Sequence, residues 1–326
     1  MAENKPEKKK KGCLGCSLPV LIFFIVITVA LLVVGFLSGA LGQSLIKGLN
    51  VPSWLKVPPP EVALPAEAVF HIGSFGVTNT ILTSWISIAL IAIILITLSS
   101  KSKIIPGKFQ SIMEQALEWV LNLCKDVAGE KNGTRFFPII VTIFLFVLFN
   151  AWLAILPGFG SIQVHEGGTV FPLLRGANTD INTPLAIALM SFVFVEFLGF
   201  SSNGFHYLKK FFNFGHFFRA WGDVFRGKVK AGCGGVLFGI IDIFVGFLEL
   251  ISEFVRIVSF TFRLFGNMTG GEILVLTVLF LIPFLVVLPV YGLELLVGAV
   301  QALIFSGLTL VFAAMAATPH EEEHHA

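Results

Sequence analysis

The stretch ELISEFVRIVSFTFRLFGNMTGGE, residues 249–272, carries several charged and amide side chains in a region otherwise as apolar as a membrane span. They are Glu249, Glu253, Arg256, Arg263, Asn267 and Glu272. At about 100° per residue on a helix, all except Glu272 fall within roughly 80° of one another. A charge in hydrocarbon costs about 2.5–3.5 kcal/mol on insertion scales, so such groups face protein or water and usually serve a function. The stretch predicts a polar stripe along one membrane helix.

Part of this stripe has a simpler interpretation, in which the charges pair with each other and only hold helices together. Glu253 and Arg256 stand three residues apart, a spacing that allows an ion pair on one helix face. Arg263 differs, because no acid lies three or four residues away on either side. An arginine without a partner on its own helix implies a partner elsewhere.

The composition of the chain is that of an integral membrane protein. Of its 326 residues, 56% are hydrophobic and only 13% are charged, whereas a soluble domain has about a quarter charged residues. The chain has four cysteines, and Cys13 and Cys16 form a lone CxxC without a second ligand pair, so we expect no metal or cofactor. No phosphate-binding loop or HExxH motif is present. We expect a multi-span protein that contacts lipid, and no nucleic-acid partner.

The chain divides into five segments. We expect a basic cytoplasmic tail over 1–17, an extra N-terminal transmembrane helix over 18–40 and a proline-rich external linker over 41–70. A membrane domain follows over 71–318 and a polar C-terminal tail over 319–326. The apolar run after the tail exceeds the 7–15 residues typical of a cleavable signal, so it is interpreted as a retained signal anchor.

Further spans are predicted at about 75–98, 136–156 and 184–200, and two long apolar stretches fill 236–318. Residues 101–129 instead show one apolar and one polar helical face, which indicates an amphipathic surface helix. A loop with short helical pieces is expected over 201–235. A helix over 236–281 would measure roughly 70 Å against a core of about 30 Å, so it must tilt steeply or break near Gly266 or Gly270 and Gly271. The prediction is an all-α membrane protein of five to six spans, one surface helix and a tilted C-terminal hairpin.

The distribution of Lys and Arg predicts the orientation. Segments 1–17, 101–135 and 206–230 hold five, six and six of these residues, whereas 41–78 and 159–183 hold two and one. Because positive loops stay on the cytoplasmic side, both termini are expected in the cytoplasm of a bacterial cell, with the protein in the plasma membrane.

A set of protonatable and amide side chains is predicted at membrane depth around Arg263. Asn267, Glu272, Glu294 and Gln301 form its main part, with Asp242, Glu249 and Glu253 further back. Acids and amides around a fixed positive charge are what a proton path needs. Arginine does not release its own proton there, so it acts as a permanent charge. For Asn267 or Gln301 alone, interhelical hydrogen bonding explains the residue equally well.

The residues also carry a family resemblance. SFTFRLFGNMTGGE (259–272) and VQALIFSGLTLVF (300–312) closely resemble subunit a of the F-type rotary ATP synthase. FNAWLAILPGFG (149–160) and NTDINTPLAIAL (178–189) fit the same family in the same order, and the likeness extends over about 71–320. Residues 1–60 have no counterpart in the family core, and the 201–235 loop with Glu196 matches less clearly.

This resemblance implies a proton-conducting stator subunit rather than an enzyme on its own. Arg263 would face the carboxylate of a ring of c subunits, with two half-channels leading to opposite sides of the membrane. Other implied partners are the peripheral-stalk b subunits and the catalytic head. The implied outer channel involves Asn267, Glu272, Gln301 and Glu294, a position where some relatives have histidine; Glu249 belongs to the cytoplasmic exit. Asn178, Asp180 and Asn182 match a motif near the outer side.

Two other classes stay open from the residues alone. An ion-coupled secondary transporter would use the intramembrane acids for substrate coupling, but it predicts inverted repeats, and no internal repeat is visible. A membrane scaffold without transport predicts that neutralising Glu272 and Glu294 changes no proton flux.

Overall fold

The computed structural model describes residues 18–46, 52–60, 65–100, 106–156, 158–166, 169–204, 207, 211 and 229–318. The predicted tails, with Cys13 and Cys16, and most of the predicted 201–235 loop lie outside this part of the chain. Helices long and apolar enough to cross a membrane are α1 (Leu18–Ser38), α3 (Asn79–Ser100), α4 (Lys108–Ile155), α5 (Asn182–Asn203) and the segment Phe284–Ala317, which contains α8 (Val287–Ala317). These five helices confirm the predicted all-α membrane fold.

The described chain forms two compact units. The larger one comprises Ala63–Thr269 and Leu295–Ala326, and the smaller one Met1–Val62 and Gly270–Glu294. In the larger unit, α4, α5, α8 and the long helix α7 (Val229–Leu281) share an apolar core. Side chains in its two clusters include Val147, Ala188, Leu264 and Phe305 in the first, and Phe136, Val195 and Leu310 in the second.

Helix α4 consists of two helical halves joined at Gly129. The backbone there has φ 78° and ψ 164°, outside the helical region, and only glycine tolerates such a positive φ without strain. The first half exposes Glu114 and Glu118 and buries Val120 and Cys124. The predicted division into two helical parts is therefore present, although Phe109 and Ile112 of the predicted apolar face are exposed and the second half begins at about residue 130 rather than 136.

Two short antiparallel hairpins were not expected from the sequence. Strands β1 (Ala68–Ile72) and β2 (Phe75–Thr78) pair directly before α3, and the turn between them contains Gly73 at φ 63°. Because Phe75–Thr78 forms a strand, the second span begins at Asn79 and not at 75. Strands β3 (Gln163–Glu166) and β4 (Thr169–Pro172) form the other hairpin, in a region predicted to be a loop. It is followed by the short helix η2 (Ala177–Thr179).

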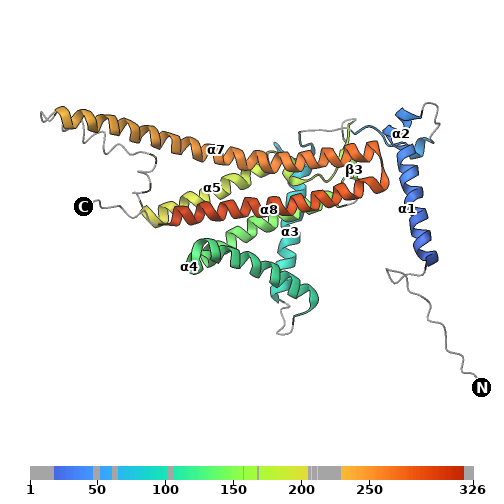
Figure 1. Cartoon of the computed structure of the whole chain (residues 1–326), viewed down its shortest axis with the longest axis horizontal. Coiled ribbons are helices and arrows are strands. Elements are labelled where there is room, and N and C mark those ends of the chain that lie inside the picture. The colour runs from blue at the N-terminus through green and yellow to red at the C-terminus, as the bar shows by residue number, and fades with distance from the viewer. Residues whose placement is uncertain are drawn as a thin grey trace, which may run out of the picture. The chain divides into compact units, whose positions relative to one another are not determined.

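Helix α7 runs for 53 residues without a break, about 80 Å at 1.5 Å per residue. The sequence predicted that such a long helix either breaks near Gly266 or Gly270 and Gly271 or tilts steeply in the membrane. The break is wrong, and the steep tilt stays a prediction. Within the larger unit, Figure 1 shows α3 running across the direction shared by α5, α7 and α8. The helix begins at Val229, so 229–235 belong to it and not to the predicted loop.

In the smaller unit, α1 lies against the turn that joins α7 to α8. A Cβ placed on Gly35 or Gly39 would overlap the main-chain carbonyl oxygen of Pro283 or Leu281, respectively. The turn contains η4 (Phe284–Val286), and Phe284 has φ 73°. This unit also holds α2 (Ala40–Leu45) and η1 (Ser53–Leu55). The two glycines allow the backbones of α1 and of the turn to touch, as small residues do between membrane helices.

Gly39→Leu is therefore expected to weaken this contact, because the added side chain has no space beside the carbonyl of Leu281. Overpacking of this kind costs about 1–3 kcal/mol. The measurement is the thermal stability of the detergent-solubilised complex, with Val29→Leu as the control because Val29 is exposed. Equal melting temperatures for the two variants would contradict the contact.

Candidate functional site

Arg263 lies on α7 beside the packed face of the helix. Its neighbours Phe260 and Leu264 are buried in the core that α7 shares with α4, α5 and α8, and Arg263 itself is half-buried. Among the residues that the structure describes, no ion pair or hydrogen bond to its guanidinium is present. The sequence interpretation of Arg263 as a cation without a partner on its own helix agrees with this geometry.

One turn further along α7, Asn267 connects this helix to α8. Its Nδ2 donates a hydrogen bond of 2.8 Å to Oε1 of Gln301. Gln301 is buried, and its Nε2 has no partner within the described residues. Interhelical hydrogen bonding, one of the two interpretations given to these amides, is therefore present, and it leaves one buried donor of Gln301 open.

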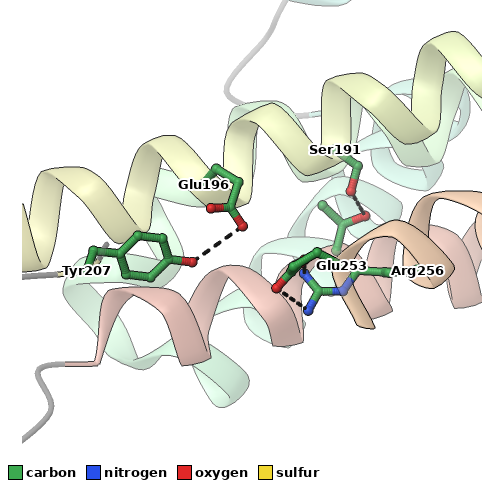
Figure 2. Close-up of polar contacts among 6 residues, drawn as sticks. Ser191, Glu196, Tyr207, Glu253 and Arg256 are labelled. Atoms are coloured by element: carbon green, nitrogen blue, oxygen red, sulfur yellow. Dashed lines mark hydrogen bonds and ion pairs between the residues drawn. The ribbon is translucent and has the colours of Figure 1, made fainter. Parts of the chain in front are cut away.

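A buried ion pair lies on the same stripe of α7, two turns before Arg263. Nη2 of Arg256 donates to Oε1 of Glu253 at 2.9 Å, and Nη1 lies 2.6 Å from Oε2 (Figure 2). The Cζ of Arg256 also lies 3.8 Å from the centre of the Phe312 ring on α8. The predicted i, i+3 pairing is thus confirmed for these two residues, and Glu253 takes part in it rather than standing alone.

Asp180 joins the N-terminal ends of two spans. One carboxylate oxygen accepts hydrogen bonds from the backbone N–H and the side-chain amide of Asn182, at 3.1 and 2.9 Å. The other accepts from the Thr80 hydroxyl at the start of α3, at 3.1 Å. Nearby in sequence, Asn178 is 2% exposed, and both its Nδ2 and its Oδ1 lack partners in the described part of the chain. Asp180 and Asn182 are brought together, whereas Asn178 is a buried amide with open hydrogen-bonding capacity.

The remaining predicted residues lie in both units. Asp242 and Glu249 are half-buried on α7 in the larger unit. Glu272 and Glu294 belong to the smaller unit, where Glu294 is 6% exposed. The Glu294 carboxylate lies against Gly271, so closely that a Cβ on this glycine would overlap it. A main-chain surface without a side chain thus forms one wall of the Glu294 site.

Several polar contacts between side chains were missed by sequence reasoning. The Ser87 hydroxyl donates to Oδ1 of Asn150 at 2.8 Å, and the hydroxyl oxygens of Ser191 and Thr309 lie 2.7 Å apart. Near the end of α5, the Tyr207 hydroxyl donates to Oε1 of Glu196 at 3.4 Å (Figure 2). Serine and threonine in a span usually bond to their own helix backbone, so their residue types gave no signal for these contacts.

These features define a multi-pass membrane protein with polar and charged side chains within its helical core. Comparison with known proteins identifies its family. Residues 81–314 match the family model described as ATP synthase A chain. The chain is 32% identical to ATP synthase subunit a of Geotalea daltonii over 239 residues, which cover 73% of this chain and 87% of that protein.

Two other relatives with the same name give similar values. Subunit a of Gloeobacter violaceus is 30% identical over 76% of this chain and 86% of its own length. That of a Sulfurihydrogenibium species is 32% identical over 71% of this chain and 93% of its own length. The chain therefore belongs to the ATP synthase A chain family, and it is a membrane subunit of that complex rather than an enzyme on its own. The family match begins at residue 81, so α1 and the residues between α1 and α3 precede it.

Proposed function

We propose that this chain is the stator subunit that conducts protons to and from the carboxyl groups of the c-subunit ring. Arg263 is the permanent positive charge that makes these carboxyl groups release their protons. The observation that carries the proposal is the guanidinium of Arg263, half-buried on α7 and without an ion-pair partner in the described part of the chain. A membrane cation in this state is stabilised when an acid from another polypeptide comes to face it.

The chemistry follows from the environment of the rotor carboxylate. Facing lipid, the carboxyl group keeps its proton, because desolvation disfavours the anion. Beside Arg263 the anion becomes the favoured form, and the proton leaves through the exit path. Since a guanidinium does not give up its own proton, Arg263 also separates the entry path from the exit path.

The two paths are assigned to separate sets of side chains. The path to the outside uses Asn267, Gln301, Glu272 and Glu294, and the cytoplasmic exit uses Glu249, with Asp242 further back on the same helix. Buried polar atoms without protein partners are places where water binds, and Asn178 and the Nε2 of Gln301 are such groups among the described residues. They support water-filled access on the outer side.

The proposal also covers the partner subunits of this chain and its orientation in the membrane. We expect contacts with the c-subunit ring, with the b subunits of the peripheral stalk and, through the complex, with the catalytic head. We also expect both termini in the cytoplasm of a bacterial cell, because the segments rich in Lys and Arg stay on that side.

Proton conduction by the membrane sector, measured in vesicles after the catalytic head is removed, tests the function. Neutralising both acids of the outer path, with Glu272→Gln and Glu294→Gln in one chain, is expected to lower proton flux at least about 10-fold, which corresponds to about 1.4 kcal/mol on the barrier. The matched control is Glu118→Gln, the same change at an exposed acid of α4.

Unchanged flux in the double variant would favour a scaffold without transport. Solute uptake driven by ions in liposomes that contain this chain alone would instead favour a secondary transporter.

A further inference from the structure

We infer that Glu253 is a positioning residue that neutralises Arg256, so that Arg263 alone acts as the counter-charge for the moving rotor carboxylate. This inference depends on the proposed function. It assigns to Glu253 a role other than carrying protons.

Two arginines lie on the same face of α7. Arg256 and Arg263 are seven residues apart, so they differ by only about 20° around the helix and by about 10 Å along it. If neither arginine had a partner in the protein, both cations would point in the same direction. A carboxylate that passes along this face would meet two positive charges in succession.

The structure treats the two cations differently. Both Nη atoms of Arg256 contact the Glu253 carboxylate, at 2.9 and 2.6 Å, and its Cζ lies over the Phe312 ring on α8. The side chain of Arg256 is 16% exposed and that of Glu253 only 5%. In the described part of the chain, Arg263 has neither an acid nor a hydrogen-bond acceptor at its guanidinium. Within the residues that the structure describes, the charge of Arg256 is therefore balanced by an acid, and that of Arg263 is not.

This difference has a direct consequence for rotation. An opposite charge within about 4–6 Å favours the ionised form of a carboxyl group. With two unbalanced arginines, the rotor carboxylate would stay ionised over a longer arc and would be held back from lipid, where it must be protonated. With Arg256 balanced by Glu253, the ionised arc is confined to the surroundings of Arg263.

The test uses the whole ATP synthase in membrane vesicles and measures proton pumping driven by ATP. Glu253→Gln leaves Arg256 as a second unbalanced cation and is expected to slow pumping at least about 10-fold. Adding Arg256→Gln removes that cation, and the pumping rate of the double variant is expected to recover to within about threefold of that of the unsubstituted complex. A role of Glu253 as a proton carrier predicts the opposite, because the double variant still lacks the carboxylate.

A second readout separates this charge effect from loss of structure. An apolar carbodiimide modifies rotor carboxyl groups only when they are protonated, so its rate reports how much of the ring is ionised. Glu253→Gln is expected to lower that rate at least about twofold, and the double variant to restore it, with equal subunit content in all purified complexes. A double variant as slow as the single one, or a single variant with normal pumping and labelling, would overturn the inference.

Arg263→Ala, measured in the same vesicles, distinguishes failure of the proposed function from failure of this inference. Pumping by Arg263→Ala would refute the function itself. A slow double variant beside an inactive Arg263→Ala complex would refute only the role of Glu253.

Discussion

Replacing Arg263 by lysine is expected to abolish proton-driven ATP synthesis, with a loss of at least about 100-fold, or about 2.7 kcal/mol on the barrier. Lysine keeps the positive charge in water, but its ammonium is a compact group that loses its proton readily when it is buried. A lysine at this position would therefore exchange protons with the rotor carboxylate and join the two paths that the guanidinium keeps apart. ATP synthesis in energised vesicles is the measurement.

Two controls accompany this substitution. The subunit content of the purified complex shows whether Arg263→Lys assembles, and we expect that it does. Arg135→Lys makes the same chemical change at an exposed position of α4 and is expected to leave synthesis within twofold of normal. Near-normal synthesis by Arg263→Lys would refute the requirement for a permanent charge.

Adding a single methyl group at Gly271 is expected to lower proton pumping about 10-fold. Any Cβ there overlaps the carboxylate of Glu294, so this carboxylate must leave its position in Gly271→Ala. The clash is with the end of a flexible side chain and not with backbone, so the fold and the assembly are expected to survive. The variant displaces an acid of the outer path without removing it, and pumping driven by ATP in vesicles measures the effect.

Gly292→Ala is the matched control for this change. Gly292 lies on α8, the helix of Glu294, and a Cβ there meets nothing within 4 Å. Normal pumping is expected for it. If Gly271→Ala pumped as fast as Gly292→Ala, the position of the Glu294 carboxylate would not matter for proton entry.

The sequence predicted the spans and the polar stripe well, for a physical reason. A charge in an apolar segment is costly, so each one is visible against its background and must be explained. Glu253 and Arg256 were recognised as a potential pair because their spacing on one helix is fixed at three residues. The elbow of α4 was visible as a change from an amphipathic to an apolar pattern, although its position at Gly129 was not.

Contacts between distant segments were beyond this reasoning. Phe312 lies on another helix from Arg256, and although it ends the family-like stretch 300–312, nothing in that stretch marks it as the contact of an arginine. The hydrogen bond between Ser191 and Thr309 depends on the packing of α5 against α8. The two short hairpins were missed because their apolar residues read equally well as parts of a span or a loop. In each case the partner is set by tertiary packing and not by local pattern.

The uncharged part of α4 beyond Gly129 predicts the bilayer thickness that this subunit fits. Beyond the elbow, the uncharged part of α4 runs from Phe136 to Ile155. Those twenty residues measure about 30 Å as a helix, close to the hydrocarbon core of an average membrane. This segment matches the lipid when it stands upright, whereas α7 is far too long to do so. We therefore expect the least hydrophobic mismatch in a bilayer with a core of about 30 Å, whereas a thinner or thicker membrane would require α4 to tilt or the surrounding lipid to deform.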